Sequence, residues 1–206
     1  MSQYIELHPS HPDPRMLAVV VDSLKSGAVI AYPTDSGYAL GCTMGQQKPL
    51  DRIRQLRDLD KTHNFTLICQ DLAEVSRFAK VDNTAYRLMK KCVPGGYTFI
   101  LKAGKTVPKS LLPSGKTTIG VRVPDHPTPL ALSAKLNEPL VSTTLILPGQ
   151  DLPLIYPEDI ADAIGDQIDV MVDVGYCGFE PTTVVDLSDN VPQILRHGSG
   201  DSQFFE

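Results

Sequence analysis

Tyr32-Pro33-Thr34-Asp35-Ser36-Gly37-Tyr38-Ala39-Leu40-Gly41 is the most informative segment of this chain, because it places a polar turn between two apolar runs. The run over residues 28–32 is short and apolar, which predicts a buried strand, and a second apolar segment covers residues 38–43. The turn presents a hydroxyl, a carboxylate and a second hydroxyl. Open α/β sheets place their ligands beside such turns. The alternative is a turn whose side chains only satisfy its own backbone.

Strands and helices are predicted to alternate on both sides of this segment. Asp13-Pro14 is typical of a helix N-terminus, and a helical pattern of apolar residues then runs to Gly27. Further helices are expected around residues 50–56, 85–89, 129–136 and 158–164. Further strands are expected at residues 65–69, 97–101, 118–123, 140–147, 170–174, 183–187 and 193–196. The alternation predicts an α/β fold: one domain over residues 1–206, with a twisted sheet of parallel and antiparallel strands flanked by helices.

Length and composition fit one folded domain. The 206 residues, 42% of them apolar and 21% charged, can bury one sizeable core. No apolar run approaches the roughly 20 residues that cross a bilayer, and residues 1–6 lack the features of a signal peptide. We therefore expect a cytoplasmic protein without a membrane partner.

The cysteines and histidines do not predict a metal site. Cys42, Cys69, Cys92 and Cys177 are far apart, and no histidine lies at ligand spacing from any of them. Each cysteine lies in or beside an apolar segment, which favours a buried thiol. No resident metal ion and no tightly bound cofactor are expected.

Charge is unevenly distributed along the chain. The formal charge of −5 argues against a protein coated in basic residues for duplex DNA. Arg52, Arg54, Arg57 and Lys61 nevertheless fall within ten positions, whereas acidic residues crowd positions 158–169. A local basic surface is therefore compatible with the acidic total.

Hydrogen-bond donors recur where predicted strands end. The segment from Arg57 to Asn64 offers groups suited to phosphate or carboxylate, and Arg122, Ser142-Thr143-Thr144 and Pro181-Thr182-Thr183 add further donors. A solvated helix end and ordinary strand caps are the alternatives. Ser114-Gly115-Lys116-Thr117 resembles the tail of a P-loop, but Ser110 stands where a glycine is required and a strand follows. No catalytic nucleophile can be specified.

These segments, in this order, resemble the YrdC family from about Ala28 to Gly198. The matching stretches are residues 32–41, Pro94-Gly95-Gly96-Tyr97-Thr98-Phe99-Ile100-Leu101, Val121-Arg122-Val123-Pro124, residues 140–149, Thr182-Thr183-Val184-Val185-Asp186 and Leu195-Arg196-His197-Gly198. The best-known members make threonylcarbamoyl-AMP from threonine, bicarbonate and ATP, for the t6A modification of transfer RNA. The resemblance therefore implies a YrdC-like fold, with ATP and Mg²⁺ as substrate-level ligands.

The resemblance also implies which residues bind substrate and nucleotide. They are Thr34, Ser36, Tyr38, Arg57, His63, Thr66, Arg122, Thr143, Thr144, Thr182 and Arg196. Their chemistry fits a reaction in which a carbamate on the threonine amine attacks the α-phosphate, because that reaction needs positioning and charge neutralisation more than proton transfer.

Two departures resemble the YciO branch of the family. The family's lysine-glycine-arginine-proline stretch appears as Arg57-Asp58-Leu59-Asp60, and its threonine-serine-alanine-asparagine stretch as Thr143-Thr144-Leu145-Ile146. Leucine and isoleucine side chains cannot hydrogen-bond a phosphate. We therefore expect weak or altered nucleotidyl-transfer activity on threonine or a related small acid. One alternative is an RNA-binding module without catalysis, for double-stranded or transfer RNA, based on Arg52, Arg54, Arg57, Lys61, Lys90 and Lys91. Another is a duplicated fold with no remaining chemistry.

Overall fold

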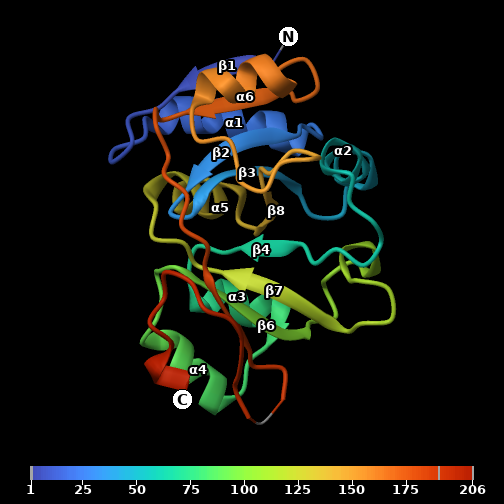
Figure 1. Ribbon diagram of the computed structural model, residues 1–206, viewed down its shortest axis with the longest axis vertical. Coiled ribbons are helices and arrows are strands. Elements are labelled where there is room, and N and C mark those ends of the chain that lie inside the picture. Colours follow the sequence, from blue (N-terminus) through green and yellow to red (C-terminus); the bar gives the residue numbers. More distant parts are fainter. Residues whose placement is uncertain (1, 190, 206) are drawn as a thin grey trace.

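An eleven-stranded sheet forms the centre of the molecule, in a computed structural model that describes residues 2–189 and 191–205 (Figure 1). The strands follow one another in the order β1-β9-β2-β3-β8-β4-β7-β6-β10-β11, and β5 pairs with β6. Their bounds are β1 (Gln3–Glu6), β2 (Ile30–Thr34), β3 (Gly37–Thr43), β4 (Thr66–Ile68), β5 (Ala79–Lys80), β6 (Tyr97–Ala103), β7 (Thr118–Arg122), β8 (Leu140–Thr144), β9 (Val170–Asp173), β10 (Thr183–Asp186) and β11 (Gln193–Arg196). Parallel and antiparallel pairs are mixed, since β4 runs parallel to β7 and antiparallel to β8.

Helices pack against this sheet. They are α1 (Pro14–Lys25), α2 (Gln47–Arg57), α3 (Leu72–Phe78), α4 (Asn83–Lys90), α5 (Pro127–Leu136) and α6 (Pro157–Ile164), with short 3-10 segments η1 (Lys109–Leu111) and η2 (Ser202–Phe205). The carboxylate of Asp13 caps α1 by accepting a hydrogen bond from the N–H of Arg15 at 2.8 Å. None of the described helices is long and apolar enough to span a membrane.

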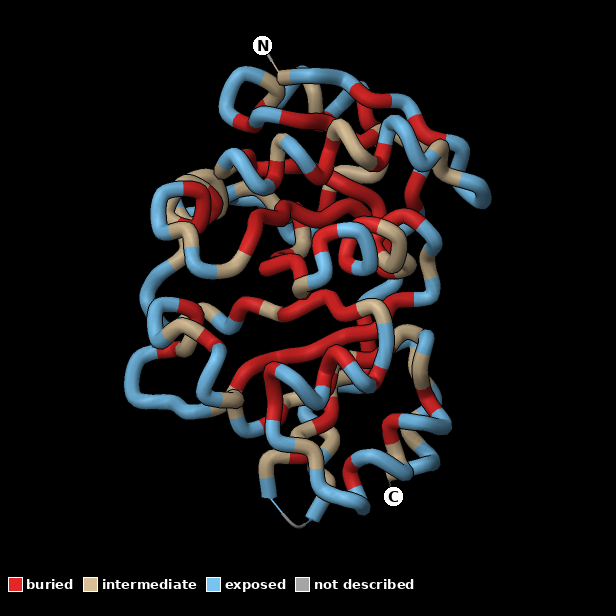
Figure 2. The backbone as a smooth tube through the Cα atoms, turned by 180° about the vertical axis from the view of Figure 1, so that it is seen from behind, coloured by how far each residue is buried: buried red, intermediate tan, exposed pale blue. Residues whose placement is uncertain are grey.

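Apolar side chains fix the helices to the sheet in two clusters. The smaller cluster joins α1 and α5 to β1, β2 and β9 through residues such as Leu24 and Leu132. The larger cluster joins α2, α3, α4 and α6 to the sheet through residues such as Ile53, Met89 and Ile160. Figure 2 shows that the buried backbone is concentrated in the central strands. Each such side chain stabilises the fold by about 1.5–3 kcal/mol, so the strands form a fixed frame for whatever binds to them.

The connection from β9 to β10 spans most of the sheet. In the strand order, β2, β3, β8, β4, β7 and β6 lie between the two strands it joins. The Tyr38 hydroxyl anchors its start, donating to the carbonyl of Gly175 at 2.8 Å and accepting from the N–H of Val174 at 3.3 Å. Tyr38 is fully buried, and burial raises the pKa of its hydroxyl. Tyr38 therefore holds this connection in place.

The predicted fold class is confirmed, and the elements differ from the prediction in a few places. The strand expected at residues 140–147 ends at Thr144, because the N–H of Ile146 turns back to the carbonyl of Thr144 at 3.0 Å. The sequence also did not predict β1, α3 or the two-residue strand β5. Only Ile5 is buried in β1, so that strand lacks an apolar alternation, and α3 is only seven residues long. The four cysteines are free and buried, as predicted.

Candidate functional site

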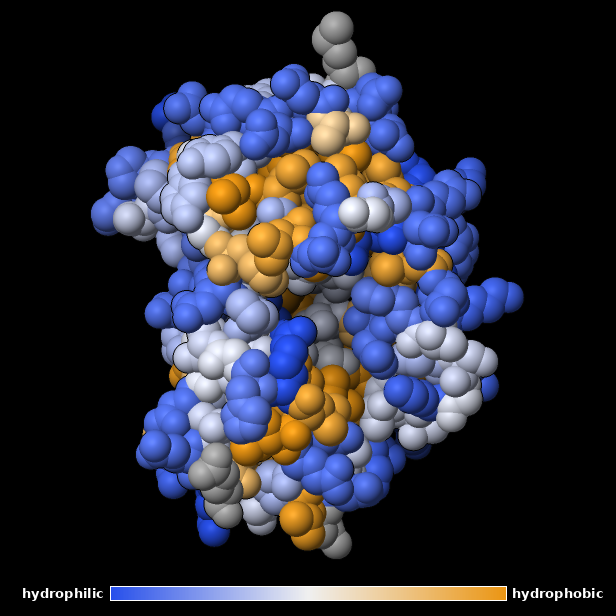
Figure 3. Space-filling model, in the orientation of Figure 1, coloured by the Kyte–Doolittle hydropathy of each residue, from blue (hydrophilic) through white to orange (hydrophobic). Residues whose placement is uncertain are grey.

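A pocket of about 500 Å³ lies on the face of β4, β7, β6 and β10 opposite the larger apolar cluster. Figure 3 shows a hollow in the middle of this side of the molecule, with hydrophobic surface above and below it. All but one of the predicted site residues line the pocket: Thr34, Ser36, Tyr38, His63, Thr66, Arg122, Thr143, Thr144, Thr182 and Arg196. Residues that are far apart in the sequence thus meet at one place.

Strand register explains the floor of the pocket. Thr66 pairs with Gly120, Gly120 with Ile100, and Ile100 with Asp186, so these four form one row across the strands. Successive residues of a strand point to opposite faces. Their neighbours in sequence therefore pack into the larger cluster: Leu67, Val121, Phe99 and Val185. Gly120 has no side chain and leaves room at the middle of the floor, where a Cβ would lie 3.1 Å from the Thr66 hydroxyl.

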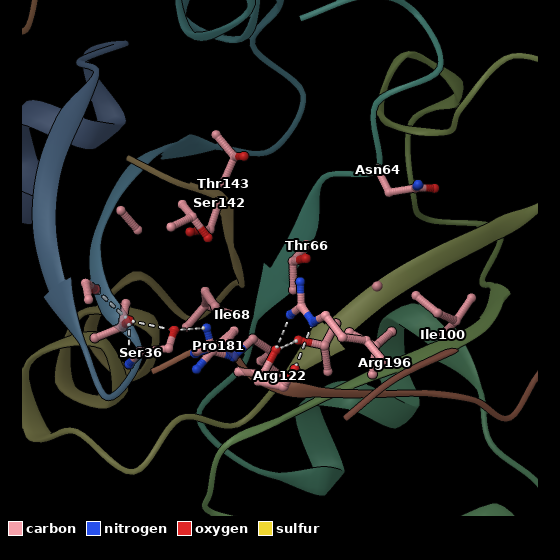
Figure 4. A pocket seen from close by; sticks show the side chains of 18 of the residues that line it. Ser36, Asn64, Thr66, Ile68, Ile100, Arg122, Ser142, Thr143, Pro181 and Arg196 are labelled. Carbon is pink, nitrogen blue, oxygen red and sulfur yellow. Dashed lines mark hydrogen bonds between the residues drawn. The ribbon is translucent and has the colours of Figure 1, made fainter. Parts of the chain in front are cut away.

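The turn between β2 and β3 holds a buried cation at one end of the pocket (Figure 4). Arg122 donates to the carboxylate of Asp35 at 2.5 Å and to the hydroxyl of Ser36 at 2.8 Å. Thr34 donates through its hydroxyl to the carbonyl of Gly37 at 2.7 Å and accepts from the N–H of Ser36 at 3.1 Å. The turn therefore satisfies its own backbone and also fixes a guanidinium at the pocket wall.

The charge of Arg122 is compensated within the protein. Its side chain is 9% exposed and that of Asp35 is 13% exposed. Burial lowers the pKa of Arg122, while the Asp35 carboxylate opposes this shift. The Nε atom of Arg122 is buried and has no partner among the described residues. The Arg122–Asp35 pair thus carries little net charge.

A second group of donors lies where β6, β10 and β11 meet. The hydroxyls of Thr98 and Thr182 are 2.8 Å apart. Arg196 donates through Nε to the carbonyl of Thr182 at 3.0 Å and through a terminal nitrogen to its hydroxyl at 3.1 Å. Arg196 forms no ion pair within residues 2–189 and 191–205. It therefore presents an uncompensated positive charge beside hydroxyl groups.

Arg57 is the one predicted site residue that does not line the pocket. It donates to the hydroxyl of Thr143 at 3.1 Å and to the carbonyl of Thr144. His63 Nε2 lies 3.0 Å from the same hydroxyl. Burial, and then the nearby Arg57 cation, lower the pKa of His63 to about 4. His63 is therefore neutral at physiological pH, and Arg57 supports the end of β8 from behind the pocket wall.

The two departures from the family motifs lie in different places. Ile146 lines the pocket. Leu59 is not among the lining residues and instead packs, partly buried, against the larger apolar cluster. The loss of a polar group at Ile146 therefore changes the pocket surface directly, whereas Leu59 belongs to the packing beneath it.

Several lining residues lie outside the predicted set of site residues: Asn64, Thr98, Lys116, Thr118, Ser142, Asp186 and Phe179. Asn64 and Ser142 belong to segments whose donors the sequence did indicate. Strand alternation predicts pocket positions for Thr98 and Ser142, because each lies on the same face of its strand as another pocket residue. Phe179 lies on the long β9–β10 connection, and no local pattern gives its position.

The basic residues named for RNA binding do not form one surface. Arg52 pairs with Asp169 at 2.7 Å, and Arg54 pairs with Asp51 at 3.0 Å. Lys90 and Lys91 lie at the end of α4, far from α2 in Figure 1. RNA binding stays a prediction. Within the part of the chain that the structure describes, no cluster of His, Cys, Asp and Glu could hold a metal ion.

A family model for Sua5, YciO and YrdC proteins, described as "Telomere recombination", matches residues 22–198. The chain belongs to the Sua5/YciO/YrdC family. Among its relatives, YciO of Escherichia coli K12 is 47% identical over 100% of both chains. The crystal structure of E. coli YciO matches this fold with a TM-score of 0.95 over 100% of both chains.

More distant members of the Sua5/YciO/YrdC family have more informative names. A threonylcarbamoyl-AMP synthase of Vibrio vulnificus is 28% identical, over 88% of this chain and 98% of the synthase. P. abyssi Sua5, solved in complex with L-threonine, shares the fold with a TM-score of 0.87 at 22% identity. That match covers 96% of this chain and 58% of the Sua5 chain. The predicted resemblance is confirmed, and the relation to threonylcarbamoyl-AMP synthesis is supported.

Proposed function

We propose that this family member binds ATP with Mg²⁺ beside threonine or a related small acid, and that it has weak or altered nucleotidyl-transfer activity. The observation that carries the proposal is the convergence of hydroxyl and cationic side chains from separate strands on one pocket of about 500 Å³. That volume lies within the range of small-molecule sites, roughly 300–1,000 Å³. Mg²⁺ enters as part of the nucleotide substrate.

The proposed reaction is adenylyl transfer to a carbamate. Bicarbonate and the amine of the acid condense to the carbamate with loss of water, and one carbamate oxygen then forms a bond to the α-phosphorus of ATP. The bond from that phosphorus to the bridging oxygen breaks, and its electron pair leaves with pyrophosphate. Such a step depends on aligned reactants and on donors that neutralise phosphate charge. Arg196, the Thr98–Thr182 pair and the Thr34–Ser36 turn are suited to that task.

Two contacts support weak rather than full activity. Ile146 offers an apolar side chain to the pocket where the family motif has an amide. One terminal nitrogen of Arg57 donates to both Thr143 and Thr144, so its charge is directed to the protein. Each lost charge-assisted contact costs about 1.5–3 kcal/mol, which corresponds to about one to two powers of ten in rate.

Calorimetry and pyrophosphate release test the proposal together. ATP with Mg²⁺ is expected to bind with a dissociation constant between about 1 μM and 1 mM. Pyrophosphate release is expected to rise when threonine and bicarbonate are added, and to remain below that of the Vibrio vulnificus synthase measured in parallel. No binding heat and no displacement of a fluorescent ATP analogue at millimolar nucleotide would refute the nucleotide site.

A further inference from the structure

The charged side chains that line the pocket are Lys116, Arg122, Asp186 and Arg196. Asp35 compensates Arg122, and Arg196 is held against Thr182 by two hydrogen bonds. Lys116 is exposed and forms no ion pair with any residue in the described ranges, Asp186 included. Its ammonium group is therefore a positive charge that faces the pocket without a partner.

Lys116 lies at the end of the pocket opposite Arg122. It precedes β7 by two residues, whereas Arg122 is the last residue of β7. Six residues of extended chain span roughly 20 Å. The pairing of Thr66 with Gly120 brings the residues before β4 beside the start of β7, and the N–H of Ser114 bonds the carbonyl of Lys61 at 3.1 Å. His63 and Asn64 therefore border the same end of the pocket as Lys116.

The turn that carries Lys116 has space around it. Gly115 has φ of +76°, and no heavy atom lies within 4 Å of the position where its Cβ would be. The N–H of Lys116 bonds the carbonyl of Pro113 at 3.0 Å, so the turn has a defined backbone. This arrangement is not a P-loop, because β7 rather than a helix follows. A lysine on such a turn acts as a mobile point charge on a long stem.

We propose that Lys116 binds the β- and γ-phosphates of the nucleotide, an inference that rests on the function proposed above. A nucleoside triphosphate is elongated, and most of its negative charge lies in the tail. At the other end of the pocket the guanidinium groups of Arg122 and Arg196 are held by Asp35 and by Thr182, which suits the binding of a small polar group. The ammonium group of Lys116 is exposed and has no ion-pair partner among the described residues. Lys116 also neutralises the charge that builds up on pyrophosphate as the bond to the α-phosphorus breaks.

The test compares nucleotides that differ only in the tail. Dissociation constants for ATP, ADP and AMP are measured by calorimetry with Mg²⁺ on the wild type and on Lys116→Met, which keeps an unbranched stem without the charge. We expect Lys116→Met to weaken ATP binding about tenfold and AMP binding less than twofold. Lys116→Arg should retain most of the ATP affinity. Lys109→Met is the matched control, because Lys109 is exposed before the same turn and does not line the pocket.

The outcomes separate the two proposals. A wild type that binds none of the three nucleotides overturns both the nucleotide site and the role of Lys116. If the wild type binds ATP, and Lys116→Met binds ATP, ADP and AMP with unchanged affinity, the nucleotide site stands and the role of Lys116 is wrong. Equal weakening of AMP and ATP also overturns the inference, because the residue would then shape the loop and not bind the tail.

Discussion

Ile146 follows the hydroxyl pair Thr143 and Thr144 in the pocket wall, where the family motif has asparagine. Leu59, the other departure, packs against the core. Both observations bear on the double variant Leu59→Arg with Ile146→Asn, which we expect to raise threonine-dependent pyrophosphate release above the wild-type level. A new arginine at a partly buried position costs stability, so thermal melting must first show that the variant folds.

The single variant Ile146→Asn should retain the wild-type melting temperature and carry most of this gain, because its side chain reaches the pocket. Ile146→Val is the control, since it changes the shape without adding a hydrogen-bonding group. If Ile146→Asn and the double variant fold, bind ATP and still release no additional pyrophosphate, these two positions do not account for the proposed weak activity.

His63 makes the stability of the fold depend on pH. Burial and the Arg57 cation lower its pKa to about 4 in the folded protein, below its ordinary value of 6.5. At pH values between about 4 and 6.5, His63 takes up a proton in the unfolded chain but stays neutral in the folded chain. Stability is therefore fully present above pH 6.5 and declines as the pH falls toward 4. Because the ring is only partly buried, the loss is on the order of 1 kcal/mol.

The variant His63→Gln should flatten this decline, because glutamine keeps a hydrogen-bonding group and has no proton to take up. Urea unfolding at pH 7.5, 5.5 and 4.5 measures the effect. His197→Gln, at an exposed position, is the control and should follow the wild-type curve. Parallel curves for His63→Gln and the wild type would contradict the assignment.

The strands that form the pocket floor were predictable because apolar runs bounded by glycine and proline are strong local signals. Phe65, Phe99 and Val121 lie on the buried face, as such runs require. The edge strand β1 was not predictable, since its pairing with β9 joins residues 3–6 to residues 170–173 and leaves only Ile5 buried. Local sequence cannot specify a partner that far along the chain.

At the scale of one strand, Gly120 is the residue on which the pocket depends. In Gly120→Val the new side chain would rise from the floor beside the Thr66 hydroxyl, which lies 3.1 Å from the Cβ position. Valine is favoured in strands, so the fold should persist. We expect ATP affinity to fall at least tenfold, as measured by calorimetry. Ile119→Val, on the buried face of the same strand, is the control. If Gly120→Val binds ATP with wild-type affinity, the nucleotide binds elsewhere.

Across the whole molecule, the dispersed basic residues limit the affinity and the sequence specificity of any RNA binding. Arg52 and Arg54 are held in ion pairs, and Lys90 and Lys91 lie on a distant helix. Any RNA binding should therefore be weak, insensitive to sequence and steeply reduced by salt. Filter binding of duplex RNA between about 50 and 200 mM salt, over which the Debye length falls by about half, measures this. Tight binding of one short sequence at the upper concentration would contradict it.

The site was predictable to the extent that motifs mark strand ends. Thr34, Arg122 and Thr182 come from such motifs and meet in the pocket. Arg57 was predicted to bind ligand, yet its hydrogen bonds run to the end of β8, a choice that depends on tertiary packing. The motif around Lys116 lacks the context of a P-loop and predicts no ligand, and only the register of β7 with β4 places Lys116 at the pocket.

The long β9–β10 connection has a consequence for the order in which this chain can fold. β9 separates β1 from β2, and β10 completes the pocket beside β6, so residues from 170 onward insert into both ends of the sheet. A ribosome-bound chain that ends before β9 has a first strand without its partner and a pocket without Thr182 or Arg196. Such non-local pairing slows folding, because long loops must close at an entropic cost before the strands can form stabilising contacts. The pocket is therefore complete, and the proposed ligand can bind, only after nearly the whole chain has been synthesised.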